Sequence, residues 1–304
     1  MTEPVLSIPG RGGFLAAELA MPAGRCCGAV VLLHPSADPS RSQFLFEHLA
    51  RVLPTLGVAV LRYDRRDAGG SADIPYLQQV DDLTNGLRVL QDAVGEVPIG
   101  LWGFSQGAWV ALLAAAANPA LAFLVLVGCS AVSPARQMRF GTAEQLRRAG
   151  YGVEQRVELD RLRSAWEEYQ RGQMSRAETQ AVVDELAGRP WFHLSWVPAV
   201  LPTKPSWKDM DFDPVDAISQ VRCPVLAFYG EDEWVPVEES IRIWRNSFRH
   251  PDELTIRRIA GTEHHPTLRG GRTIASISPE YTATLTNWVT DVLDTARQTW
   301  PAPR

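Results

Sequence analysis

The 304-residue sequence has only four cysteines and no cluster of histidine and cysteine at the spacing of metal ligands. Two of the cysteines are adjacent, and the other two lie in apolar runs typical of strands. That distribution favours buried thiols over a disulfide framework, because a small set of paired cysteines would stand at loop positions. Neither a structural zinc site nor any other metal site is therefore expected. The cysteines are Cys26, Cys27, Cys129 and Cys223.

The sequence also lacks an excess of basic residues and a long apolar run. Its formal net charge is −5, whereas a protein that neutralises phosphates needs a basic face, so nucleic acid is not an expected partner. No run approaches the roughly 18 apolar residues of a membrane span. The first residues, MTEPVLSIPG, carry neither the basic nor the apolar region of a secretory signal. We expect a soluble, cytoplasmic protein without a membrane partner.

What the sequence does contain is an alternation of apolar runs and amphipathic segments, within an ordinary globular composition of 45% hydrophobic and 21% charged residues. Continuous apolar runs such as 28–33 and 58–63 are typical of strands buried on both faces of a sheet. The alternation predicts an α/β fold with a mainly parallel central sheet and helices on both faces. No Gly-x-Gly-x-x-Gly follows the early strands, so a dinucleotide-binding domain is not favoured. The expected strands are 5–8, 14–21, 28–33, 58–63, 121–127, 223–229 and 254–259, and the expected helices between them are 44–56, 76–94, 237–248 and 279–295.

The character of the chain changes after residue 133. Residues 135 to about 190 are rich in Arg, Glu and Gln and predict two or three amphipathic helices without a strand. The sequence thus predicts a core formed by 1–133 and 213–304, interrupted by a helical cap at 134–212. Tryptophans among prolines near its end suit an apolar pocket, whereas the alternative is a peripheral decoration. The candidate substrate-binding residues are Trp191, Trp196 and Trp207.

The stretch Gly103-Phe104-Ser105-Gln106-Gly107 has the Gly-x-Ser-x-Gly form of a nucleophile elbow. It stands between a short apolar strand, which begins near Pro98, and a helix that runs through Ala108 to Ala117. Glycines suit such a turn because side chains beside the serine would collide with the strand and helix. Ser105 is therefore the candidate nucleophile, although the bare pattern also occurs by chance in Gly-rich loops.

A serine nucleophile needs a general base and a carboxylate that orients it, and both should follow later strands in the order Ser, acid, His. The chain has a carboxylate loop, Gly230 to Pro236, after one predicted strand, and a histidine loop, Ala260 to Pro266, after the next. Each residue alone would more often be a solvated loop residue. Two such loops at the required strand ends favour a complete catalytic triad.

The oxyanion hole of an elbow enzyme uses the N–H of the residue after the nucleophile and one from the loop after an earlier strand. Here the first donor is the backbone of Gln106. The loop after the strand 28–33 begins His34-Pro35-Ser36, and because proline has no N–H, the second predicted donor is the backbone of Ser36. The His34 side chain is expected to cap the strand end by hydrogen bonds.

Five segments in this order make the chain resemble the α/β-hydrolase superfamily, and specifically bacterial serine esterases with a helical cap. The resemblance covers nearly the whole length outside the predicted cap. It implies Ser105 as nucleophile, His264 as base, and Ser36 with Gln106 as oxyanion donors, with no cofactor. The segments are VVLLHPSADPSRS, LRYDRRDAGGSA, LWGFSQGAWVALLAA, AFYGEDEWVP and AGTEHHP.

Three positions depart from the family pattern. Pro35 replaces the usual glycine after the histidine, and Asp67 replaces a glycine in the segment that begins at Asp64. The acid loop is one residue short, so counting from Gly230 selects Glu233, whereas counting back from Val235-Pro236 selects Asp232. We prefer Asp232, because Asp-x-x-Val-Pro is the longer match. The spacing from Gly261 selects His264 over His265.

The predicted function is hydrolysis of a carboxylic ester or thioester through a Ser-His-Asp triad and an acyl-enzyme. The alternative is a non-hydrolytic cyclase or lyase that keeps the fold and uses the capped apolar pocket. The expected partner is a small, partly apolar molecule, and the chain is expected to be a monomer or homodimer.

Overall fold

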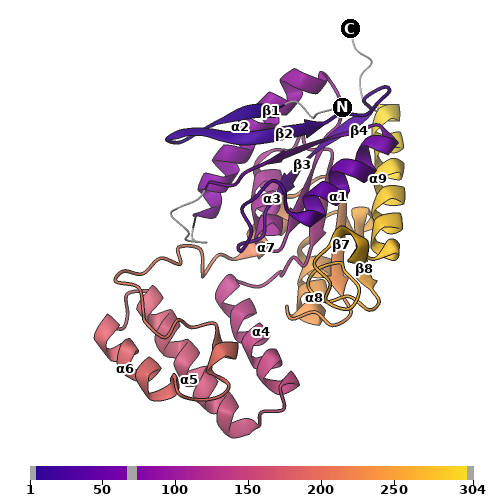
Figure 1. Ribbon diagram of the computed structural model, residues 1–304. Helices are drawn as coiled ribbons and strands as arrows, with labels where there is room; N and C mark the ends of the chain where they lie inside the picture. The colour runs from indigo at the N-terminus through magenta and orange to yellow at the C-terminus, as the bar shows by residue number, and fades with distance from the viewer. Residues whose placement is uncertain (1–4, 67–73, 300–304) are drawn as a thin grey trace. The chain divides into compact units, whose positions relative to one another are not determined.

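The computed structural model describes residues 5–66 and 74–299 (Figure 1). They form two compact units. The first contains the described residues up to Ala131, then Pro214–Glu233, then those from Val237 onward; the second contains Val132–Asp213 and Trp234–Pro236. Residues 234–236, which the sequence analysis assigned to the first unit, thus fall in the second. The predicted departure at Asp67 lies outside the described residues.

The first unit is organised around one eight-stranded sheet of order β1-β2-β4-β3-β5-β6-β7-β8. β1 and β2 form an antiparallel hairpin, and β2 pairs antiparallel with β4, whereas the pairs from β4 through β3 to β8 are parallel. This confirms the predicted fold class, a mainly parallel sheet. The strands are β1 (Val5–Gly10), β2 (Gly13–Ala20), β3 (Gly28–Leu33), β4 (Val58–Tyr63), β5 (Ile99–Phe104), β6 (Phe123–Val127), β7 (Val225–Gly230) and β8 (Leu254–Ile259).

The parallel strands form where the sequence has short, continuous apolar runs. Every residue of β3, β5, β6 and β7 is buried, as expected for strands covered on both faces. β8 is the last strand of the sheet and exposes Arg257 and Arg258, which suits an edge strand because charged side chains discourage pairing with another chain. Because the strands from β4 through β3 to β8 run parallel, their carboxyl ends lie at the same edge of the sheet.

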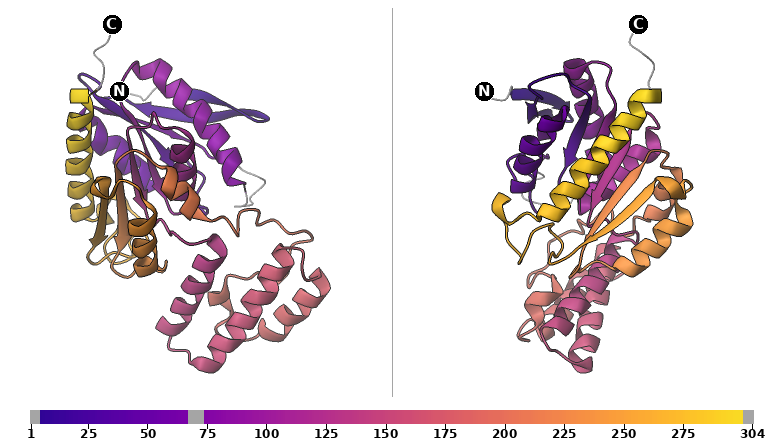
Figure 2. Two further views of the ribbon diagram at one scale, coloured as in Figure 1. Left: turned by 180° about the vertical axis from the view of Figure 1, so that it is seen from behind. Right: turned by 90° about the vertical axis from the view of Figure 1, so that its right-hand side faces the viewer.

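Helices cover both faces of the sheet (Figure 2). On one face, α1 (Phe44–Val52) and α9 (Pro279–Thr299) pack on apolar side chains that the strands supply. On the other, α2 (Tyr76–Val94), α3 (Gln106–Ala117), α7 (Pro214–Gln220) and α8 (Val237–Ser247) follow one another as neighbours. The helix predicted at 44–56 ends at Val52 and continues as a 3₁₀ turn, Leu53–Leu56, because Pro54 removes a backbone donor.

The second unit is helical, with α4 (Pro134–Arg148), α5 (Val153–Gln170) and α6 (Arg176–Leu186). Ser133 caps α4 and Ser175 caps α6, each by accepting a hydrogen bond from a backbone N–H of the first turn. The helices enclose a small apolar core that includes Leu159, Leu162 and Trp191. Among the residues that the structure describes, this unit contains no strand.

Within the described ranges, none of the helices is long and apolar enough to cross a membrane. All four cysteines are free; Cys129 and Cys223 are buried, and Cys26 and Cys27 are half-buried.

A buried hydrogen bond ties the last helix to the centre of the sheet. The indole Nε1 of Trp102 in β5 donates to the hydroxyl of Tyr281 in α9, at 2.9 Å. Tyr281→Phe leaves that buried donor without its acceptor and is expected to lower the free energy of unfolding by about 2 kcal/mol. Urea unfolding checks this, with Tyr151→Phe at a half-buried position of the second unit as the control. Equal stabilities of the two variants would contradict the prediction.

Candidate functional site

Ser105 stands in the one-residue turn between β5 and α3. Its backbone has φ 54° and ψ −116°, a left-handed conformation that a non-glycine residue adopts only where its surroundings enforce it. A Cβ added at Gly103 would lie 2.4 Å from the carbonyl oxygen of Gly107, and one added at Gly107 would lie 2.3 Å from that of Leu33. The two glycines therefore allow the helix to start directly against the end of β3. The turn has the geometry of the predicted elbow.

His264 lies close to this turn. Its imidazole ring is 5.1 Å from the ring of Phe104, the residue before Ser105. On the other side, a Cβ added at Gly128 would meet the imidazole Cε1 at 2.7 Å. Gly128 follows Val127, whose carbonyl accepts a 2.8 Å hydrogen bond from the N–H of Ser105. Phe104, at the end of β5, and Gly128, just after β6, thus both border the histidine.

The carboxylate that contacts His264 is that of Glu233. Its Oε1 lies 2.7 Å from the imidazole Nδ1, and both residues are buried. Since an ionised carboxylate only accepts hydrogen bonds, Nδ1 is the donor, and Nε2 is left as the basic nitrogen of the neutral ring. This is the arrangement in which a carboxylate orients a histidine base.

Asp232, preferred in the sequence analysis, is exposed, and its backbone N–H donates to the carbonyl of Thr262 at 3.0 Å. The geometry therefore favours Glu233, the alternative that the loop spacing left open, as the carboxylate partner of His264. The physical reason is a close contact between two loops: a Cβ added at Gly230 would lie 1.9 Å from the carbonyl oxygen of Glu263. The acid loop therefore packs closely against the histidine loop, and Glu233, three residues after Gly230, contacts His264.

The structure separates the two adjacent histidines. His265 Nε2 lies 2.7 Å from Nη1 of Arg272, and its ring packs edge-on against Phe104 at 4.6 Å. Burial, with the positive charge of Arg272 and the neighbouring His264, lowers the pKa of His265 to about 3. His265 is therefore neutral at pH 7, and its Nε2 lies against the Arg272 guanidinium, whereas His264 contacts Glu233.

The two predicted oxyanion donors flank one buried guanidinium. Gln106 is the first residue of α3, where backbone N–H groups have no acceptor within the helix. Pro35 and Ser36 follow β3 directly, and their carbonyl oxygens both accept from Arg65, each at 2.6 Å. Arg65 also donates to the side-chain Oε1 of Gln106 at 3.0 Å. The structure thus brings the Ser36 loop and Gln106 together through Arg65.

Sequence reasoning missed Arg65 and its neighbour Gln79. Gln79 donates from Nε2 to Gln106 Oε1 at 3.2 Å and to the carbonyl of Ile74 at 2.9 Å. The only signal was the place of Arg65 in the segment after β4, at the same edge of the sheet as the elbow. A single arginine in such a loop reads as a solvated residue, and its burial depends on contacts distant in sequence.

The cap aromatics are dispersed within the second unit. Trp191 is 1% exposed in the apolar core and donates to Glu158, so it is a packing residue there, not the pocket residue that the sequence analysis expected. Trp207 lies beside the guanidinium of Arg163, 6.0 Å from ring centroid to Cζ. Trp196 is 40% exposed and packs edge-on against Trp234 at 5.0 Å.

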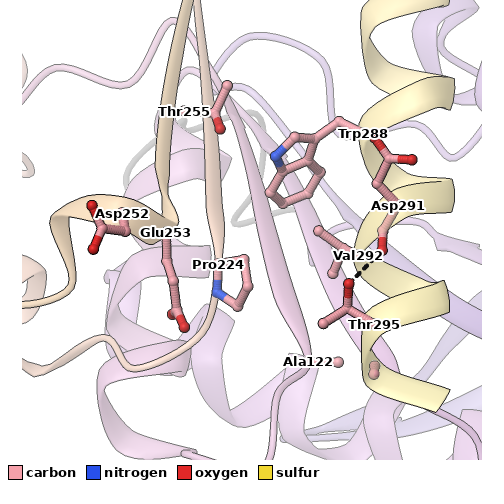
Figure 3. Close-up of a pocket in the computed structure, with 10 residues that line it drawn as sticks. Ala122, Pro224, Asp252, Glu253, Thr255, Trp288, Asp291, Val292 and Thr295 are labelled. Carbon is pink, nitrogen blue, oxygen red and sulfur yellow. Dashed lines mark hydrogen bonds between the residues drawn. The ribbon is translucent and has the colours of Figure 1, made fainter. Parts of the chain in front are cut away.

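A cavity of about 460 Å³ lies in the first unit, beside the amino ends of β6, β7 and β8 and against α9. Figure 3 shows Trp288 facing it from α9, with Pro224 and Glu253 on the strand side. Ser105 instead follows the carboxyl end of β5, so this cavity does not belong to the candidate site.

Across residues 5–66 and 74–299, no group of three or more His, Cys, Asp or Glu side chains is placed to hold a metal ion. The carboxylates of the acid loop have other partners. Glu231 accepts from the N–H of Gly261 at 2.8 Å, and Glu233 accepts from His264.

Comparison with known proteins identifies the family and the fold. Residues 30–276 match the model of the alpha/beta hydrolase family. The chain is similar to the proline iminopeptidase of Mycobacterium smegmatis, with 17% identity and a TM-score of 0.62 over 96% of this chain and 100% of that one. A thermostable carboxyl esterase from Bacillus coagulans has the same identity and TM-score, over 96% and 99%. An alpha-beta serine hydrolase homologue from Coxiella burnetii is 18% identical, with a TM-score of 0.54 over 95% and 98%. At these identities the likeness is one of fold. None of the curated protein sequences matches the chain.

His34, at the end of β3, generates a pH-dependent contribution to stability. Burial, aided by the charge of Arg65, lowers its pKa from 6.5 to about 3. Below pH 6.5 His34 binds a proton in the unfolded chain but stays neutral in the folded chain. The free energy of unfolding therefore falls as the pH drops from 6.5 toward 3. Between pH 7 and pH 5 this residue contributes a loss of about 2 kcal/mol in the free energy of unfolding.

His34→Asn removes that titration, so its unfolding free energy should fall by about 2 kcal/mol less than that of the wild type over the same interval. Urea unfolding at the two pH values measures both. Parallel pH profiles for the variant and the wild type would contradict the assignment of a neutral buried His34.

Proposed function

The chain belongs to the alpha/beta hydrolase family, and we propose that it is a serine hydrolase that cleaves carboxylic esters through Ser105, His264 and Glu233. The observation that carries the proposal is the 2.7 Å contact between His264 Nδ1 and Glu233 beside the strained turn of Ser105. Burying a histidine and a carboxylate and straining a serine backbone all cost stability. Proteins retain such features together mainly at catalytic sites.

In the proposed reaction, His264 acts as the general base. Glu233 holds the Nδ1–H tautomer, so Nε2 takes the proton of the Ser105 hydroxyl while the serine oxygen attacks the ester carbonyl carbon. The negative charge on the former carbonyl oxygen is stabilised by the backbone N–H groups of Gln106 and Ser36. Such fixed donors are usually among the largest contributions to this kind of catalysis.

The tetrahedral intermediate collapses when His264 returns its proton to the leaving alkoxide. The ester bond breaks, an alcohol departs, and the acyl group stays on Ser105. Water then attacks the acyl carbon, losing its proton to Nε2 of His264, and the acid is released with the serine oxygen protonated again. Proton transfers balance over the cycle, and the net reaction consumes one water.

The proposed substrate is a small, partly apolar ester, with a thioester as the second class to test. A carboxyl esterase is among the similar structures, which supports beginning with esters. The second unit is proposed to act as a lid. Its aromatic pair Trp196 and Trp234 supports this, because Trp196 is exposed and Trp234 directly follows Glu233 in the chain.

Ser105→Ala tests the nucleophile. The variant is expected to lose ester hydrolysis by at least about 10³-fold while its unfolding transition stays that of a folded protein. Hydrolysis of p-nitrophenyl esters of increasing chain length, with acyl-CoA thioesters alongside, measures the activity. A fluorophosphonate probe should label the wild type once, at Ser105, and leave Ser105→Ala unlabelled.

Activity of Ser105→Ala near that of the wild type would rule out the proposed nucleophile. A wild-type protein that neither reacts with the probe nor hydrolyses any ester or thioester would favour the alternative, a non-hydrolytic cyclase or lyase with the same fold.

The assignment of Glu233, not Asp232, as the proposed triad acid is tested by a matched pair of variants. Glu233→Gln keeps the size of the side chain but replaces an obligatory acceptor with an amide, so the histidine loses its held tautomer. We expect kcat to fall by about 10³-fold. Asp232→Asn, at the adjacent exposed position, should keep kcat close to that of the wild type. The reverse order of the two kcat values would restore Asp232 as the acid.

A further inference from the structure

Arg65 is buried at the candidate site. Its side chain, in a residue that is 8% exposed, makes charge-assisted hydrogen bonds to Pro35, Ser36 and Gln106. Nη1 donates to the carbonyl of Pro35 at 2.6 Å and to Gln106 Oε1 at 3.0 Å, and Nη2 donates to the carbonyl of Ser36 at 2.6 Å. Removing a guanidinium from water costs free energy, so its hydrogen bonds must offset that cost.

The bond to Pro35 determines which way an oxyanion donor points. The carbonyl of Pro35 and the N–H of Ser36 belong to one planar peptide unit, in which the two groups point in opposite directions when the bond is trans. The structure has no cis peptide among its described residues. With the oxygen of Pro35 directed at Arg65, the N–H of Ser36 is directed away from it. A second bond, to the carbonyl of Ser36, holds the next peptide unit.

The bond to Gln106 reaches the other donor. Gln106 Oε1 accepts from both Arg65 and Gln79, so two donors hold its side-chain oxygen. The backbone of Gln106 begins α3. The planar fork of one guanidinium thus joins the two segments that carry the predicted oxyanion donors. A lysine could supply the charge, but its single ammonium lacks the rigid fork that spans both segments.

The positive charge also acts through these bonds. A carbonyl that accepts a charge-assisted hydrogen bond is polarised, and the N–H of the same peptide unit becomes a stronger donor. In a buried setting this effect is larger than it would be in water. The oxyanion that forms during acyl transfer gains from it, whereas a neutral ground-state carbonyl gains less.

We propose that Arg65 is a positioning residue of the oxyanion hole, which orients the Ser36 and Gln106 donors and strengthens the Ser36 donor from behind. This inference rests on the proposed serine-hydrolase function. Arg65 acts on the transition state through the Ser36 loop and makes no contact with the substrate.

The test compares Arg65→Met and Arg65→Lys with Arg62→Met. Arg62 is the matched control, because it is a mostly buried arginine of neighbouring β4 whose guanidinium pairs with Glu18 at 2.8 Å. We expect Arg65→Met to lower kcat on p-nitrophenyl esters by about 10- to 100-fold, somewhat less than removal of a direct donor. KM should change little, and the rate of fluorophosphonate labelling of Ser105 should fall in parallel with kcat.

Arg65→Lys should lie between Arg65→Met and the wild type, and Arg62→Met should keep the wild-type kcat. Arg65→Ala adds a readout that a purely structural role would not move: guanidinium at millimolar, non-denaturing concentration should restore part of its kcat. Thermal unfolding of each variant shows that the comparison is made on folded protein. Should Arg65→Met fail to fold, Arg65→Lys against Arg62→Met carries the same test.

Wild-type kcat in the Arg65 variants, or a loss shared equally by Arg62→Met, would overturn the proposal while leaving the hydrolase function intact. A rise in KM at constant kcat would overturn it too, because a binding role would then explain the loss. A wild-type protein without ester hydrolysis and without labelling at Ser105 would refute the proposed function, and the role of Arg65 would fall with it.

Discussion

The site depends on one close approach between backbones, at the point where α3 begins against the end of β3. A side chain at Gly107 would meet the carbonyl oxygen of Leu33 at 2.3 Å, so the helix can start there only because that side chain is absent. The approach places the first N–H groups of α3 beside the loop of Pro35 and Ser36. It also forces Ser105 into a left-handed conformation, which side chains normally avoid. Strain at the serine and the pairing of the two predicted donors therefore have the same origin.

A second close approach decides the other half of the site. Gly230 lies against the carbonyl of Glu263. The N–H of Glu231 donates to the carbonyl of Ile259 at the end of β8, and the N–H of Asp232 donates to that of Thr262 in the histidine loop. With these backbone bonds made, Asp232 is exposed and Glu233 is buried against His264. The family spacing in the sequence was ambiguous because the loop is one residue short. Hydrogen bonds between loops, which no spacing encodes, removed that ambiguity.

The charges around the site are distributed so that the histidines do different things. His34 and His265 are both kept neutral by burial and by an arginine nearby, and each packs among aromatic rings. His264 alone contacts a buried carboxylate. Positive charge is concentrated instead at Arg65, behind the predicted oxyanion donors. In this arrangement the imidazole of His264 and the predicted oxyanion donors come from different loops.

The sequence by itself determined the fold class, the alternation of strands and helices along the chain, and the turn of Ser105, because apolar periodicity and obligatory glycines are local signals. It also placed an acid loop and a histidine loop after consecutive strands. Only the tertiary structure brought Glu233 into contact with His264, placed Trp191 in a core, and revealed Arg65 as the link between Ser36 and Gln106. Each of these depends on contacts between residues distant in sequence, some 30 to 40 positions apart for the bonds of Arg65 and Glu233. Which side chain such a contact buries is decided by packing and backbone hydrogen bonds, and these exist only after the chain has folded.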